Sequence, residues 1–254
     1  MKTFDLKKSW NLSFALAKAW FKLKNEGSYL GIFWYLLNPL LMFLLLLLVF
    51  KPLLGQSIEN YPLYLFLGII MFNFFQQTTQ EATRIIYDYR GLIKSIYFPK
   101  ISLVASVILK SLFVHFFEFL LFAFFGIFLG LKLATVLYYL PIIILLAILT
   151  FGISLILATS AIFFRDVENI WIFAVRLLWL ATPIFYVLES NSFLAQFILL
   201  NPLSVFITLA RETMLYANMP NLLLITSAVI YSLTALLIGI LIYHTQEKKL
   251  AELI

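Results

Sequence analysis

Three side chains that could carry a proton or a charge stand inside one long apolar segment, at Lys110, His115 and Glu118. His115 and Glu118 are three residues apart, so on a helix they would share one face and could bond each other. A charge at the centre of a membrane helix costs about 2.5–3.5 kcal/mol on insertion scales, so it needs a partner or a wet cavity. One interpretation is a proton relay. The other, which we favour, is polar packing inside a bundle, with Lys110 reaching toward the inner interface.

A second charged group, Arg165, Asp166 and Glu168, lies in "FFRDVENIW" (163–171) between two apolar runs. Asp166 could cap the helix that follows and favour its positive N-terminal end. Arg165 could hold a phosphate or a neighbouring carboxylate. The group is either a solvated turn with a helix cap or a turn that also transmits motion to the next helix.

The sequence lacks the residue groups that catalysis would need. None of its nine glycines begins a GxxxxGK[ST] phosphate-binding loop. His115 and His244 are the only histidines and lie in different apolar runs, and no carboxylate pair at helical spacing stands within such a run. We therefore expect no catalytic residue, no metal and no cofactor in this chain, which favours a conduit or a scaffold over an enzyme.

The composition is that of a membrane protein. The chain of 254 residues is 63% hydrophobic and 12% charged, with a mean hydropathy of +1.02. A membrane-spanning helix needs roughly 20 mostly apolar residues, and six runs approach or exceed that length: 31–50, 62–80, 101–131, 136–164, 170–188 and 222–243. The expected fold is therefore an all-α integral membrane protein with six transmembrane helices.

Two segments outside these runs are also helical by pattern. In 4–26, one helical stripe is polar and another apolar, formed respectively by Lys7, Asn11, Lys18, Lys22 and by Leu12, Leu16, Ala19, Leu23. This predicts an amphipathic interface helix in a cytoplasmic segment 1–28, ahead of a transmembrane domain 29–254. Between spans five and six, the short apolar pieces 192–200 and 203–215 are interpreted either as two re-entrant helices in an outward-facing segment 190–215 or as a surface loop.

Basic residues set the expected orientation. Most Lys and Arg fall on one side of the proposed membrane, and Lys51, Lys132 and Arg211 fall on the other. By the positive-inside rule both termini are cytoplasmic, in the inner cell membrane. The net charge of +6 is thus a topology signal and does not indicate nucleic acid as a partner. We expect no cleaved signal peptide, because the first apolar run is full length, and the lack of Cys excludes disulfides.

The second span is polar in its inner half, where "QQTTQEATR" (76–84) follows the apolar part. Amides that face lipid are costly, so Gln76, Gln77, Gln80 and Glu81 must face protein or water. This predicts a polar cavity at the inner end of the second span. The next connector, "YDYRGLIKSIYFPK" (87–100), is basic, is punctuated by Gly91 and Pro99, and has room for a turn or two of helix between them.

Five segments in this order resemble the membrane subunit of ABC-type polysaccharide exporters: "LGIFWYLLNPLL" (30–41), "LIKSIYFPK" (92–100), "FFRDVENIW" (163–171), "TPIFY" (182–186) and "NPLSVFITLAR" (201–211). That family exports lipid-linked O-antigen, capsule or teichoic acid chains. The resemblance implies a homodimer with two copies of a separate ATPase, which would hold ATP and Mg²⁺. It also implies that 84–100 carries the coupling helix, whose expected ATPase contacts are Arg90, Leu92, Ile93, Lys94 and Ile96.

An exporter also needs a path for its substrate. Aromatic rings stack on the apolar faces of sugars, and amides bond their hydroxyls, so the candidates for a glycan path are Phe33, Trp34, Tyr35, Gln76, Gln80 and Tyr186. A polyprenyl-pyrophosphate head group would need basic side chains, for which Lys22, Lys24 and Arg84 are available. Two alternatives remain open: a proton-coupled secondary transporter using His115 and Glu118, and an intramembrane glycan or lipid transferase.

Overall fold

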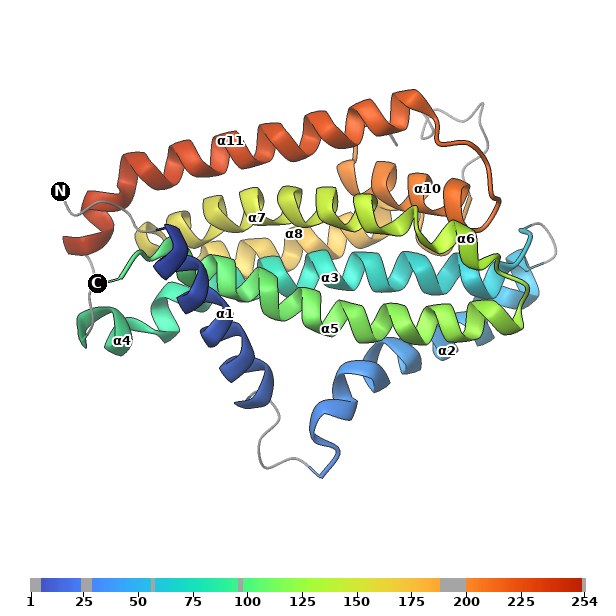
Figure 1. Ribbon diagram of the computed structural model, residues 1–254, viewed down its shortest axis with the longest axis horizontal. Coiled ribbons are helices and arrows are strands. Elements are labelled where there is room, and N and C mark those ends of the chain that lie inside the picture. Colours follow the sequence, from blue (N-terminus) through green and yellow to red (C-terminus); the bar gives the residue numbers. More distant parts are fainter. Residues whose placement is uncertain (1–5, 24–28, 56–57, 96–97, 188–199, 253–254) are drawn as a thin grey trace.

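The computed structural model describes residues 6–23, 29–55, 58–95, 98–187 and 200–252 (Figure 1). All regular structure in these residues is helical, which confirms the all-α class. The elements are α1 (Leu6–Leu23), the 3-10 turn η1 (Gly31–Phe33), α2 (Trp34–Leu54), α3 (Tyr61–Asp88), α4 (Arg90–Ser95), α5 (Ile101–Phe128), α6 (Leu133–Val136), α7 (Tyr139–Phe163), α8 (Val167–Ala181), α10 (Pro202–Met214) and α11 (Leu222–Glu252).

Helix α3 is the centre of the bundle. In its first half, each apolar residue of 65–67 and 69–72 is at most 1% exposed, so the helix is buried on every side. A helix that is hydrophobic all round is one that other helices enclose, and α2, α5, α7, α8 and α10 all pack against this one. Its second half is polar on one face, and the helix continues through these residues to Asp88 as the sequence predicts.

Among the described residues, four helical segments are long and apolar enough to cross a membrane: Trp34–Leu54, Ile101–Phe128, Ala134–Phe163 and Leu222–Gln246. The fifth expected run is shorter than predicted, because α8 ends at Ala181 and not at 188. The cause is Pro183, which disfavours helical backbone at the residue before it, and Thr182 is extended with ψ 130°. A helix of 15 residues is about 22 Å long.

Helix α1 lies across the start of α5 (Figure 1). Ser13, Ala17 and Trp20 are its buried face, and the Ser13 hydroxyl donates to the Ser102 carbonyl over 3.1 Å. The predicted apolar stripe is therefore wrong at Ala19, which is exposed. The small side chains of Ser13 and Ala17 let the backbones of α1 and α5 approach each other. This close packing decides which face of α1 is buried, although Leu12 and Leu16 are more hydrophobic. On the polar stripe Asn11, Lys18 and Lys22 are exposed, as expected.

Helices α7 and α11 pack along their length (Figure 1). A Cβ at Gly152 would lie 2.3 Å from the backbone carbonyl of Ala235, and one at Gly239 would lie 2.4 Å from the carbonyl oxygen of Gly152. Small residues allow close contact between membrane helices, whose association gains little from the hydrophobic effect. This contact therefore fixes α11 against the rest of the bundle.

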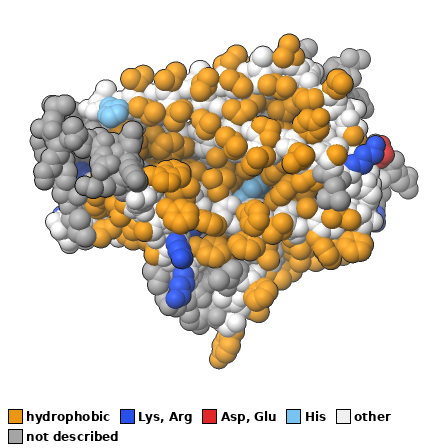
Figure 2. Space-filling model, in the orientation of Figure 1, with side chains coloured by type: hydrophobic (Ala, Val, Ile, Leu, Met, Phe, Trp, Pro, Cys, Tyr) orange, Lys and Arg blue, Asp and Glu red, His pale blue; other side chains and the backbone are white. Residues whose placement is uncertain are grey.

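The two ends of the bundle differ. Helix α4 and the last turns of α11 lie at one end, and α6 and α10 lie at the other (Figure 1). Helix α10 begins where the sequence predicts a short helix, with Asn201 as its cap: the Asn201 side chain accepts from the Leu203 amide over 3.0 Å. Its proposed partner, 192–200, lies mostly outside the described residues. Between the ends, hydrophobic side chains cover nearly all of the face in Figure 2.

Candidate functional site

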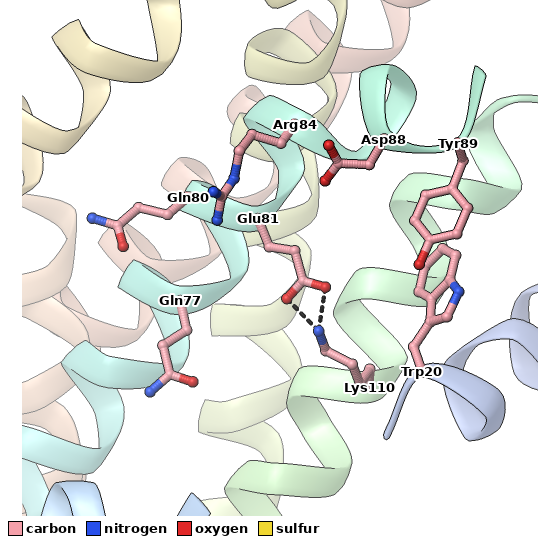
Figure 3. Close-up of a pocket in the computed structure, with 8 residues that line it drawn as sticks. All are labelled: Trp20, Gln77, Gln80, Glu81, Arg84, Asp88, Tyr89 and Lys110. Carbon is pink, nitrogen blue, oxygen red and sulfur yellow. Dashed lines mark hydrogen bonds and ion pairs between the residues drawn. The ribbon is translucent and has the colours of Figure 1, made fainter. Parts of the chain in front are cut away.

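A polar cavity of about 400 Å³ opens beside the second half of α3 (Figure 3). One face of α3 supplies most of its lining, at spacings of three and four residues: Gln77, Gln80, Glu81, Arg84 and Asp88. Helix α5 adds Lys110, and α1 adds Trp20, which packs on Tyr89 with ring centres 4.5 Å apart. A polar cavity beside the polar half of this helix, as predicted, is confirmed.

Lys110 and Glu81 form an ion pair across this cavity, with the Lys110 ammonium donating to both carboxylate oxygens (Figure 3). The Lys110 side chain is 4% exposed and that of Glu81 is 27% exposed. A buried ammonium needs such a partner, because its desolvation is otherwise uncompensated. Lys110 thus pairs sideways with α3, where the sequence analysis had it reach toward the inner interface.

The cavity carries balanced charge, with two acidic and two basic side chains among its lining residues. Burial, and to a lesser degree the carboxylates of Glu81 and Asp88, raises the pKa of Tyr89, so its phenol stays a neutral donor. Arg84 lies at the rim and also pairs with Glu168, with 3.4 Å between Nε and Oε1. Neither cation is therefore a ready-made phosphate site, since each already faces a carboxylate.

The turn before α8 contacts the end of α3. Besides the contact between Glu168 and Arg84, the Arg165 guanidinium lies 5.1 Å from the centre of the Tyr87 ring. Asp166 stands at the cap position but its side chain makes no cap hydrogen bond. The predicted capping is wrong because Asp166 has helical backbone angles (φ −71°, ψ −10°), whereas a capping side chain reaches its amides from extended backbone.

Helix α4 follows α3 directly and occupies the position predicted for the coupling helix. The Arg90 guanidinium stacks on the Tyr87 ring at 3.3 Å from its centre, and Ile93 packs partly onto an inner cluster formed by α1, α3, α5, α7 and α11. Leu92 is half-buried and Lys94 is exposed. Ile96 lies outside the described residues. The helix is thus anchored on one side and open on the other.

Residues 12–215 match the ABC-2 type transporter family. The chain belongs to this family. The match runs from α1 to the end of α10 and includes the cavity, α4 and the turn before α8. An ABC transporter membrane subunit implies an ABC ATPase as its partner, which agrees with the lack of a phosphate-binding loop in this sequence.

Similar proteins cover the chain almost end to end. It is 26% identical over 245 residues to the "O-antigen export system permease protein RfbA" of Myxococcus xanthus, a match that covers 95% of this chain and 94% of that protein. A protein of the same name from Klebsiella pneumoniae is 27% identical over 241 residues, covering 92% of this chain and 91% of its own length. These proteins are therefore similar to this ABC-2 chain over its whole length, the match including the region of the cavity.

The residues predicted for substrate contact do not form one site in this ABC-2 subunit. Gln80 and Arg84 line the cavity, whereas Lys22 is exposed on α1 and Lys24 lies outside the described residues. The sequence therefore identified part of the cavity wall and missed the residues opposite it, Trp20 and Tyr89.

The remaining glycan-path candidates are dispersed. Phe33 is 71% exposed and Trp34 is 37% exposed at the start of α2, but Tyr35 is buried and stacks on Phe21 at 5.3 Å. Gln76 is half-buried on α3 and is not among the residues that line the cavity. Tyr186 lies beyond the far end of α8, and its hydroxyl donates to the Leu180 carbonyl over 2.8 Å.

His115 and Glu118 do face each other, with 3.4 Å between Nδ1 and Oε2. The other ring nitrogen of His115 lies 2.6 Å from the Tyr139 hydroxyl on α7. All three residues are at most 3% exposed. The cluster therefore links α5 to α7 inside the bundle, in agreement with the polar packing that we favoured. The part of the chain that the structure describes contains no group of three metal-ligating side chains.

Arg211 forms a polar centre that the sequence analysis missed. The positive-inside count placed it on the outer side of the membrane; in the structure it is 3% exposed and donates to the carbonyls of Tyr64, Pro183 and Ile184 at 2.6–3.2 Å. The approach is possible because a Cβ at Gly68 would lie 2.6 Å from Nη2 of Arg211. No spacing within one helix indicates this contact, because its members lie on α3, on α10 and in the segment after α8.

Proposed function

We propose that this chain is the permease subunit of an ATP-driven exporter that moves a lipid-linked polysaccharide from the cytoplasmic side across the inner cell membrane. The observation that carries the proposal is the near full-length similarity to three permease proteins named for O-antigen export. The cavity supports it, because it places polar groups at the end of α3 from which the expected coupling helix extends.

The proposed topology has six crossings, by α2, α3, α5, α7, α8 and α11, with both termini cytoplasmic. Segment 1–28 lies in the inner interface, and 29–254 forms the transmembrane domain. Segment 190–215 dips into the membrane from outside. Support comes from the gathering of α4 and the last turns of α11 at one end of the bundle (Figure 1). Helix α4 contains Arg90 and Lys94, and the end of α11 contains Lys248 and Lys249.

The proposed assembly contains two copies of this chain and two ATPase subunits, which hold ATP and Mg²⁺. Six helices enclose at most half of a path wide enough for a glycan, so a second copy is needed. Arg90, Leu92, Ile93, Lys94 and Ile96 of the coupling segment 84–100 contact the ATPase. A mass measurement in nanodiscs that finds an active monomer would contradict this assembly.

The polyprenyl-pyrophosphate head group approaches the cavity from the cytoplasmic side. Because Arg84 already pairs with Glu168, binding exchanges one anion for another: Arg84 leaves the carboxylate and takes the phosphate, with Lys22 and Lys24 adding positive charge. The sugar chain then follows Gln76, Gln80 and the aromatic side chains Phe33, Trp34, Tyr35 and Tyr186. Binding of the head group would thereby release the proposed cytoplasmic end of α8 from α3.

Deletion of the chain in its native cell tests the function. We expect lipid-linked polysaccharide to accumulate on the cytoplasmic side and surface polymer to disappear, with both reversed by the wild-type chain. Topology is tested separately in this Cys-free sequence. A cysteine at exposed Asn218 should react with an impermeant reagent from outside and one at exposed Ser95 only from inside. The opposite pattern would contradict the orientation.

A further inference from the structure

An apolar groove of about 590 Å³ lies between α5 and α7 and is crossed at one end by α1. Its lining is hydrophobic apart from Ser13 and Ser102. The groove shares no lining residue with the polar cavity, and no residue of α4 lines it. Figure 2 shows that hydrophobic side chains cover most of this side of the molecule, so the groove opens onto the surface that would face lipid.

The length of the groove matches one leaflet of a bilayer. Its α5 wall runs from Ile101 to Leu112, and its α7 wall runs antiparallel from Phe151 to Leu140. At 1.5 Å per residue each wall is about 16 Å long, which is half of a hydrocarbon core of about 30 Å. A phospholipid acyl chain has that length, whereas a polyprenyl chain is several times longer.

The α1 end of the groove contains a buried hydroxyl, that of Ser102. Ser102 is 1% exposed and lines the groove in the first turn of α5. Its Oγ has no hydrogen-bond partner among the described residues, whereas its backbone carbonyl already accepts from Ser13. A buried hydroxyl without an acceptor is costly. The Oγ of Ser102 is closed off from the groove, so an ester carbonyl at this end of the groove would supply an acceptor once the Ser102 side chain rotates toward it.

Positive charge lies next to the same end. Trp10 lines both the groove and a neighbouring hollow that contains Asn11 and Lys18. The sequence 6–23 has no acidic residue, and Lys18 and Lys22 are exposed. Figure 2 shows basic side chains projecting from the region of α1 beside the apolar face. An anionic head group at this place would meet cations and no competing carboxylate of α1.

We propose that the groove holds one acyl chain of an anionic phospholipid of the inner leaflet, with its phosphate at Lys18 and Asn11 and an ester carbonyl at Ser102. The bound lipid fills the space between α5 and α7 and fastens α1 to them. The proposal rests on the proposed orientation, in which α1 is cytoplasmic, but not on which polymer is exported. Trp10, which is 58% exposed, suits the boundary between acyl chains and head groups.

The test is native mass spectrometry of the complex of this chain with its ATPase, taken from nanodiscs made of equal parts phosphatidylglycerol and phosphatidylethanolamine. The wild type should retain phosphatidylglycerol in preference. Ala105→Phe fills the groove and should lose most of the retained lipid, and Lys18→Gln should reduce the preference for phosphatidylglycerol about five-fold. Two controls should behave as the wild type: Leu237→Phe, at a 60% exposed site on α11, and Lys132→Gln, at an exposed site far from α1.

Three results would overturn the proposal: no lipid retained by the wild type, a polyprenyl lipid in the groove, or equal retention of phosphatidylglycerol by Ala105→Phe and the wild type. Lys18→Gln decides the head-group part even if Ala105→Phe folds poorly, because Lys18 is an exposed side chain. An unchanged preference for phosphatidylglycerol in Lys18→Gln would contradict the proposed contact between Lys18 and the lipid phosphate. A wild-type complex that retains phosphatidylglycerol but exports no lipid-linked polysaccharide would contradict the proposed function and leave the lipid proposal intact.

Discussion

Arg84 of α3 and Glu168 of α8 lie 3.4 Å apart between Nε and Oε1, at the end of the bundle where α4 leaves α3. Beside them Arg165 stands over the Tyr87 ring. The turn before α8 is therefore joined to the last turns of α3, which carry the expected coupling helix. A displacement of α4 by an ATPase would act on α3 and α8 together.

The other ends of α3 and of the α8 segment are also joined. The hydroxyls of Tyr61 and Tyr64 donate to the carbonyls of Phe185 and Tyr186 over 3.0 and 2.9 Å. Arg211 binds the carbonyls just before them. Helix α8 and its extension are thus attached to α3 at both ends, which gives a continuous physical connection between the two sides of the bundle.

Glu168→Lys should lower the amount of polymer exported per ATP hydrolysed, because it replaces the ion pair with two cations. Stability should change by no more than about 1 kcal/mol, since both side chains are substantially exposed. Asp166→Lys is the matched control, as Asp166 lies exposed in the same turn and caps no helix amide. Equal coupling ratios in the two variants would show that the contact with Arg84 has no role in transmission.

Ile93→Asp should separate ATP hydrolysis from export, because Ile93 packs partly onto the cluster formed by α1, α3, α5, α7 and α11, and a carboxylate there would loosen α4, the proposed ATPase contact, from the bundle. Ser95→Asp places the same carboxylate on an exposed part of α4 and should keep export near the wild-type level. Export and ATPase activity are measured with both subunits bound, after size-exclusion confirms normal assembly. Wild-type export by Ile93→Asp would mean that coupling passes through another element.

The Lys110–Glu81 pair should respond unequally to loss of its two members. Glu81→Gln removes the carboxylate that faces the buried ammonium and should cost about 3 kcal/mol. Lys110→Met should cost only about 1 kcal/mol, because Glu81 is 27% exposed and can be solvated in the cavity. Unfolding of both variants in detergent measures the difference. Equal losses would argue against a dry environment around Lys110.

Gly68→Ala should destabilise the bundle by about 1–3 kcal/mol through overpacking. Ala is normally the better helix former, but here its Cβ would lie 2.6 Å from the Arg211 guanidinium and 3.3 Å from the Ile184 carbonyl oxygen. Gly91→Ala is the control, since nothing lies within 4 Å of a Cβ there, and it should be neutral or stabilising. Thermal unfolding that ranks the two variants in reverse would refute this close contact.

Sequence patterns predicted the features that depend on local chemistry. The amides after Phe75 require a polar environment, so the cavity beside α3 was foreseeable, as was a short helix in 87–100, although α4 (Arg90–Ser95) contains Gly91 and does not begin after it. The early end of α8 was also readable in principle from Pro183. These features depend on residues close together in the chain.

The features that were missed join distant segments. Arg211 meets Tyr64 across 147 residues and Ile184 across 27, and no periodicity within one helix reports such a contact. Likewise, Ser13 and Ala17 face α5 although leucines stand beside them, because backbone approach between α1 and α5 decides that face. Such contacts follow from the packing of whole helices.

Transport into sealed vesicles tests the central claim most directly. The chain and its ABC ATPase are reconstituted into liposomes with lipid-linked polysaccharide, and movement of the glycan to the side opposite the ATPase is measured by its access to a glycan-cleaving enzyme. We expect movement that requires both subunits and ATP with Mg²⁺, and that is insensitive to a proton gradient. Movement driven by a proton gradient without ATP or the ATPase would contradict the account.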